Sequence, residues 1–60
     1  MKKRIVYRDR VFLDPWRCID TERTVILSRT FTNGGVLYGY VDSFNVRCIS
    51  LEDIISIDDC

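Results

Sequence analysis

Apolar and polar residues alternate along this chain in short runs typical of β-strands. Each run is rich in β-branched and aromatic residues, and turn residues separate the runs at short intervals. We expect strands at residues 3–8 and 10–13 (one strand, or two interrupted near Asp9), 24–31, 38–42, 46–51 and 54–57, with residues 16–20 as a candidate short strand. Asp14-Pro15 should end the first run, because proline disfavours continuing a ladder. Asp20-Thr21-Glu22 and Ser43-Phe44-Asn45 are expected to form turns, and residues 50–54 a single helical turn capped by Ser50.

The stretch FTNGGVLYGY, residues 31–40, contains all three glycines of the chain. Asn33-Gly34 predicts a hairpin with a type I′ turn, whose two central residues need positive φ. With those residues central, Phe31 faces Val36 and Arg29 faces Tyr38. One face of the pair should then carry Leu27, Phe31, Val36, Tyr38 and Tyr40, by the two-residue period of strands. Gly39 suits a sharp bend in the second strand.

The same glycines do not fit a phosphate-binding loop. The stretch lacks the lysine and the Ser or Thr of such loops, and no helix is expected after it. Five strands with tight turns in 60 residues predict one all-β domain over residues 1–60, a small SH3-like or Sm-like barrel. A chain this short buries little surface, so pairing into a homo-oligomer would add stability. Most of the aromatic residues should be needed to fill the core.

The C-terminal stretch VRCISLEDIISI, residues 46–57, resembles the closing strands of WYL domains. The matching positions are Arg47, Ile49, Leu51 and Ile54, and the resemblance covers about a third of the chain. It implies an Sm-like barrel of the kind that senses nucleic acid or nucleotide ligands in bacterial and phage-defence regulators. The Trp-Tyr-Leu triplet of that family is absent here, and its second basic position is Asp53.

Charge is distributed unevenly although the net charge is zero. Residues 1–30 hold eight basic and four acidic residues (8 − 4 = +4), and residues 31–60 hold one basic and five acidic residues (1 − 5 = −4). This asymmetry has two interpretations. It marks a basic binding face, or the two ends of the chain lie side by side in one sheet and neutralise each other. We favour the second interpretation.

Composition argues against an enzyme and against a metal or cofactor site. The chain has no histidine, so no Ser-His or Cys-His pair can form. Cys18, Cys48 and Cys60 lack metal-ligand spacing, and an odd count argues against a disulfide framework. Cys18 and Cys48 are expected to be buried, and Cys60 exposed. No apolar run is long enough to span a bilayer and the start does not fit a signal peptide, so we expect a cytoplasmic protein without membrane contact.

These features predict a non-catalytic binding module. A small chain of this type is expected to be a phage or bacterial regulatory or inhibitory protein that binds a host protein. The alternative is a nucleic-acid or nucleotide binder that uses its basic N-terminal strand and its exposed aromatic residues. The candidate binding residues are Lys3, Arg4, Arg8, Arg10, Trp16, Arg17, Arg29, Tyr38, Tyr40 and Arg47.

Overall fold

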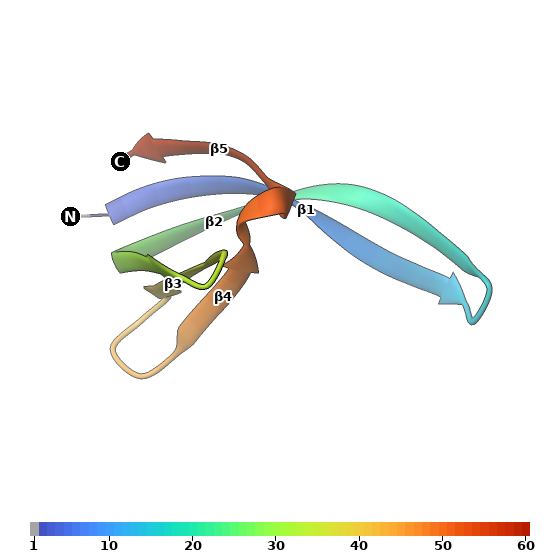
Figure 1. The fold of residues 1–60 in the computed structure, drawn as a ribbon, viewed down its shortest axis with the longest axis horizontal. Helices are drawn as coiled ribbons and strands as arrows, with labels where there is room; N and C mark the ends of the chain where they lie inside the picture. The colour runs from blue at the N-terminus through green and yellow to red at the C-terminus, as the bar shows by residue number, and fades with distance from the viewer. Residues whose placement is uncertain (1) are drawn as a thin grey trace.

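The computed structural model describes residues 2–60 and contains one antiparallel sheet of five strands. The elements in chain order are β1 (Lys2–Asp14), β2 (Arg17–Asn33), β3 (Val36–Tyr40), β4 (Val46–Ser50), the 3₁₀ turn η1 (Leu51–Asp53) and β5 (Ile54–Asp59). Their order across the sheet is β4-β3-β2-β1-β5, so the first and last strands are neighbours (Figure 1). The all-β prediction is confirmed. The predicted barrel closure is not, because the sheet is open.

The first two strands are longer than the sequence indicates. β1 is continuous through Asp9 and ends at Asp14 as expected, with the turn at Pro15-Trp16. The turn predicted at residues 20–22 is wrong, because this segment lies inside β2 and pairs in register with Arg10, Asp9 and Arg8. The ladder that this segment forms with β1 outweighs the turn preference of Asp20.

Residues 8–22 form a two-stranded arm that extends from the sheet (Figure 1). Pairing of β1 with β5 stops at Tyr7, and pairing of β2 with β3 starts at Ser28. The molecule therefore measures 39 × 22 × 22 Å, with a Cα radius of gyration of 12.5 Å. A compact chain of this length would have a radius of gyration of about 10 Å. The arm accounts for the difference.

The hairpin between β2 and β3 turns on Gly34-Gly35 instead of Asn33-Gly34. The φ angles of these glycines are +60° and +76°, as both central positions of a type I′ turn require. Asn33 thereby becomes the last residue of β2 and pairs with Val36, and Phe31 pairs with Tyr38. The predicted pairing of Phe31 with Val36 is therefore wrong.

A β-bulge interrupts the pairing of β2 with β3. Side chains of β2 that would share one face without the bulge therefore lie on opposite faces on its two sides. Ser28 pairs with Tyr40 and Phe31 with Tyr38, so two residues of β2 stand opposite Gly39 alone. Arg29, the first of the two, has a φ of +52°. Leu27 consequently faces the core while Phe31 lies on the outer face of the sheet, which corrects the prediction that they share a face.

The core is small and almost entirely aliphatic. Its buried side chains are Ile5, Tyr7, Leu27, Leu37 and Ile49, with Val25 and Ile54 packed against them. Arg47 on β4 donates a hydrogen bond of 2.7 Å to the Tyr7 hydroxyl on β1. This contact joins two strands that are not neighbours in the sheet, so the sheet curls around its inner face.

Residues expected in the core lie instead at the surface. The exposed aromatic residues include Phe12, Trp16, Phe31 and Phe44, so the prediction that most aromatics fill the core is wrong. The prediction for two cysteines is also wrong, because Cys18 lies on the arm and Cys48 on the outer face of β4. Cys60 is exposed as expected. Among residues 2–60 there is no helix long and apolar enough to cross a membrane.

Candidate functional site

The structure separates the candidate residues into four places, and the first is the start of β1. Lys3 forms an ion pair of 2.9 Å with Asp59, and Arg4 one of 3.8 Å with Asp58. The hydrogen bond from Lys3 and its charge lower the pKa of the Asp59 carboxyl. Because β1 and β5 are adjacent, the basic and acidic ends of the chain compensate each other at this edge, as the second interpretation of the charge asymmetry expects.

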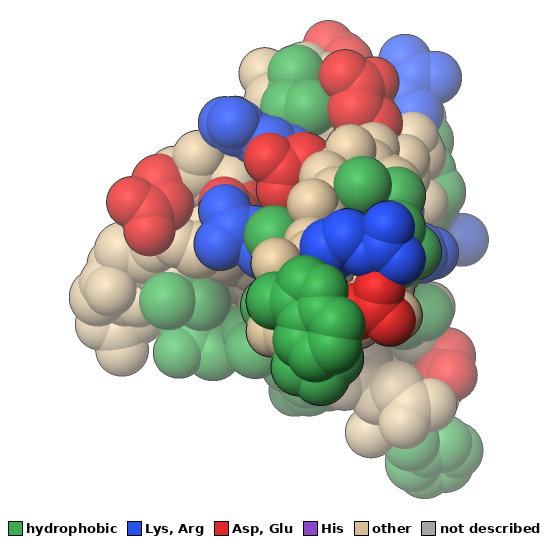
Figure 2. Space-filling view, turned by 90° about the vertical axis from the view of Figure 1, so that its right-hand side faces the viewer, with side chains coloured by type: hydrophobic (Ala, Val, Ile, Leu, Met, Phe, Trp, Pro, Cys, Tyr) green, Lys and Arg blue, Asp and Glu red, His purple; other side chains and the backbone are tan. Residues whose placement is uncertain are grey.

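The arm carries the second group, Arg8, Arg10, Trp16 and Arg17. Arg10 pairs with Asp20 at 3.4 Å, and the Arg17 Nε donates to Asp14 at 2.7 Å. At the tip, the Trp16 side chain is 80% exposed. Figure 2 looks toward this end of the molecule and shows hydrophobic side chains surrounded by both signs of charge. The tip is therefore suited to apolar contact and not to binding through net charge.

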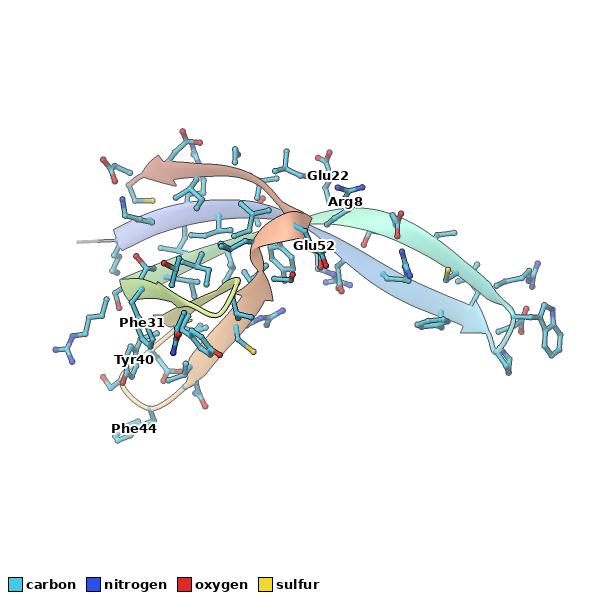
Figure 3. The ribbon with its side chains drawn as sticks, viewed as in Figure 1. Arg8, Glu22, Phe31, Tyr40, Phe44 and Glu52 are labelled. Atoms are coloured by element: carbon cyan, nitrogen blue, oxygen red, sulfur yellow. The ribbon has the colours of Figure 1, made fainter. Side chains whose placement is uncertain are left out.

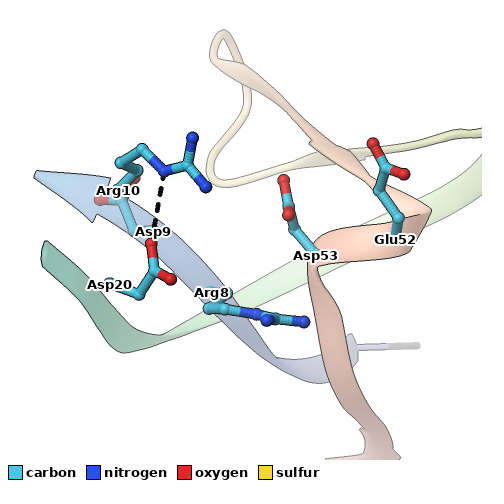
Figure 4. A pocket seen from close by; sticks show the side chains of 6 residues that line it. All are labelled: Arg8, Asp9, Arg10, Asp20, Glu52 and Asp53. Carbon is cyan, nitrogen blue, oxygen red and sulfur yellow. Dashed lines mark hydrogen bonds and ion pairs between the residues drawn. The ribbon is translucent and has the colours of Figure 1, made fainter. Parts of the chain in front are cut away.

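A groove of about 480 Å³ lies at the base of the arm. It is lined by Arg8, Asp9, Arg10, Asp20, Glu52 and Asp53, and Figure 4 shows how η1 brings its two carboxylates opposite the arm. Ligand pockets are mostly apolar with a few polar groups, whereas this groove is lined by charged side chains of opposite sign. We assign it no ligand.

The outer face of β2, β3 and β4 holds the third group. We define the aromatic patch as Phe31, Tyr38, Tyr40, Val46 and Cys48. Tyr38 stands directly between Phe31 and Cys48, and Tyr40 faces Val46, so the patch is a set of cross-strand neighbours. The Phe31 and Tyr38 rings stack at 5.1 Å with an angle of 16°, and Phe31 remains 53% exposed. Figure 3 shows Phe31 and Tyr40 beside each other on this face, with Phe44 on the loop beyond.

Arg29 borders the aromatic patch. Its guanidinium carbon lies 6.0 Å from the centre of the Tyr40 ring, within the range of a cation–π contact. The predicted pairing of Arg29 with Tyr38 is wrong, because Tyr38 pairs with Phe31, and the structure brings Arg29 to Tyr40 instead. A hollow of about 290 Å³ lies here, lined by Lys2, Ser28, Arg29, Tyr40, Val41, Asp42 and Ser43.

Arg47 alone occupies the fourth place, apart from the other three groups. Its guanidinium sits 5.8 Å from the centre of the Tyr7 ring and bonds to the Tyr7 hydroxyl. It therefore supports the fold from the inner side. Phe31, Val46 and Cys48 are absent from the candidate residues. The place of Phe31 depends on the register of β2 with β3, and that of Val46 and Cys48 on the register of β4 with β3.

No group of three or more potential metal ligands occurs among residues 2–60. Comparison with protein-family models, with curated proteins and with solved structures finds no match for this chain. The assignment of a site therefore depends on geometry alone, and the aromatic patch with Arg29 is the surface whose chemistry best fits an interface.

Proposed function

We propose that this protein is a non-catalytic binding module that engages a protein partner through the aromatic patch. The observation that carries the proposal is the stacked pair Phe31–Tyr38, half-exposed on a sheet face beside Arg29 and Tyr40. Aromatic residues and arginine are the side chains enriched in interface cores and in the residues that dominate binding energy. The stack also holds both rings in place before binding, which reduces the entropy lost on association.

We further propose that the module is a small cytoplasmic regulator or inhibitor of phage or bacterial type, acting on a host protein. Its fold would be an opened form of the SH3-like or Sm-like barrel. Two features support this fold proposal: β5 pairs with β1 after the single turn η1, and Arg47 reaches across the inner face to Tyr7. The resemblance to WYL domains stays a prediction.

The nucleic-acid alternative has less support. It depends on the basic N-terminal strand, and there Lys3 and Arg4 are already paired with carboxylates. A phosphate backbone would have to displace Asp59 and Asp58, and their charges would oppose its approach. The proposed partner is therefore a protein.

The proposal predicts that Phe31→Ala weakens capture of the partner at least about tenfold, the size of effect typical of residues that dominate an interface. The measurement is an affinity pull-down from a lysate of cells that make the protein, followed by titration of the recovered protein. Phe44→Ala is the matched control, because Phe44 is also a phenylalanine, is 92% exposed and lies outside the aromatic patch.

Phe44→Ala is expected to bind like the wild type. The proposal fails if Phe31→Ala retains full affinity, or if both variants lose it equally. Circular dichroism of both variants checks that the sheet is intact, which we expect because both side chains are mostly solvent-exposed.

A further inference from the structure

The bulge gives the Arg29 backbone a positive φ that the residues next to it in the sequence do not predict. Arg29 is the only residue other than glycine with positive φ among residues 2–60. A long side chain in this left-handed region is strained, and such strain concentrates at functional sites. β-bulges often redirect a side chain next to a binding site. The side chain redirected here is a cation held above the Tyr40 ring.

The Arg29 guanidinium, whose carbon lies 6.0 Å from the centre of the Tyr40 ring, is suited to bind an oxyanion. Its planar group presents N–H donors that can bind two oxygens at once. Lys2 and Ser43 line the same hollow, whereas the Ser28 hydroxyl donates its hydrogen to the Tyr40 backbone oxygen at 3.4 Å. Two positive charges and the Ser43 hydroxyl thus border a space of about 290 Å³.

One carboxylate also lines the hollow, but its oxygens are engaged within the β3–β4 loop. Asp42 accepts hydrogen bonds from the Phe44 amide at 2.8 Å, the Asn45 amide at 3.0 Å and the Asn45 side chain at 2.7 Å. The same bonds lower the pKa of Asp42, so it stays ionised. The lining therefore carries Lys2 and Arg29 against Asp42, a net charge of 2 − 1 = +1.

We propose that this hollow binds an anionic group, and that in the complex the group is a carboxylate or phosphate on a side chain of the protein partner. The identity of the occupant rests on the proposed function, whereas the anion site does not. The aromatic patch would hold an apolar residue of the partner, and the hollow an acidic or phosphorylated residue beside it. Charge at the border of an apolar contact fixes which partner binds and in which register.

Nuclear magnetic resonance titration with inorganic phosphate and with acetate tests the site, at constant ionic strength. We expect the amide signals of Ser28, Arg29 and Tyr40 to shift together as either anion is added. Arg29→Gly should weaken phosphate binding at least about tenfold, a factor expected when one of two cations is lost. Its melting temperature should be unchanged or higher, because glycine adopts positive φ without strain. Loss of binding could not then be attributed to unfolding.

Arg8→Ala is the control, because it removes the same charge from the arm and leaves the hollow intact. It should bind phosphate like the wild type. The anion site is wrong if neither anion shifts these amides, or if Arg29→Gly and Arg8→Ala have equal effects. A second titration uses a single-stranded oligothymidine. If it binds more tightly than phosphate and Arg29→Gly abolishes that binding, the occupant is nucleic acid and the acidic side chain is excluded.

The pull-down separates this inference from the proposed function. A partner that is lost with Phe31→Ala but fully retained with Arg29→Gly would leave the aromatic patch as its binding surface and would overturn the hollow as part of it. Loss of the partner with both variants is the expected result.

Discussion

Replacing Leu27 by alanine is expected to lower the melting temperature by more than roughly 10 °C and to leave much of the protein unfolded at 37 °C. Leu27 has no exposed surface and belongs to a core that, among residues 2–60, has five buried side chains. A buried Leu→Ala change costs about 3 kcal/mol or more, from lost burial and the cavity left behind. A domain of this length has a total stability of only about 3–9 kcal/mol.

The measurement is thermal and urea unfolding followed by circular dichroism. Ile26→Ala is the matched control, because Ile26 is the preceding residue and its side chain points to the opposite, solvent-facing side of β2. It should cost less than about 1 kcal/mol. An equal loss of stability in the two variants would mean that Leu27 and Ile26 do not lie on opposite faces of β2.

Gly39→Ala is expected to destabilise the protein by about 1–3 kcal/mol, the usual cost of overfilling a packed site. A Cβ on Gly39 would lie 2.8 Å from the Leu27 Cβ, 3.0 Å from its Cδ1 and 3.0 Å from the Thr30 Cγ2. The Leu27 Cβ is fixed to the backbone, so it cannot move aside without shifting β2. The bulge and the bare backbone of Gly39 together allow the two strands to approach.

Whether Gly39→Ala lowers or raises the melting temperature shows whether this position is packed or open. Gly39 does not have positive φ, so alanine in an open position of the same strand would stabilise the fold by restricting the unfolded chain. A higher melting temperature for Gly39→Ala would therefore contradict the packing described. Cys48→Ala on the outer face of the next strand is the control and should change stability little.

The sequence is informative about which segments are strands and much less about their registers. Alternation and β-branched residues identify the strands, and Pro15 and the glycines identify two of the turns. Asn33-Gly34 and Gly34-Gly35 are both good type I′ turns, however, and local preference does not choose between them. The choice depends on packing, because Gly39 must meet Leu27 and Thr30 across the bulge.

The residues of the candidate site are difficult to predict for the same reason, because they depend on strand registers. Tyr38, Tyr40 and Arg29 are recognisable from their chemistry, and the two-residue period predicts Phe31 on the same face as both tyrosines, as the structure has it. The separation of Leu27 from Phe31 and the approach of Arg29 to Tyr40 depend on the bulge at Arg29, which has no local sequence signal. The charge asymmetry predicts that the two ends compensate each other, but it does not identify the pairs that Lys3 and Arg4 form with residues 56 and 54 positions away (59 − 3 and 58 − 4).

The two-stranded arm has a consequence for how the molecule opens. An isolated hairpin is only marginally stable in water, and residues 8–22 have no third strand to pair with. We expect amide hydrogens in the arm to exchange with solvent by local opening, many times faster than those of Ile5 and Leu27, which await global unfolding. Hydrogen exchange followed by mass spectrometry would show two populations of amides, and uniform protection would contradict this expectation. Free in solution, the arm would then be the first part of the fold to become accessible to proteases.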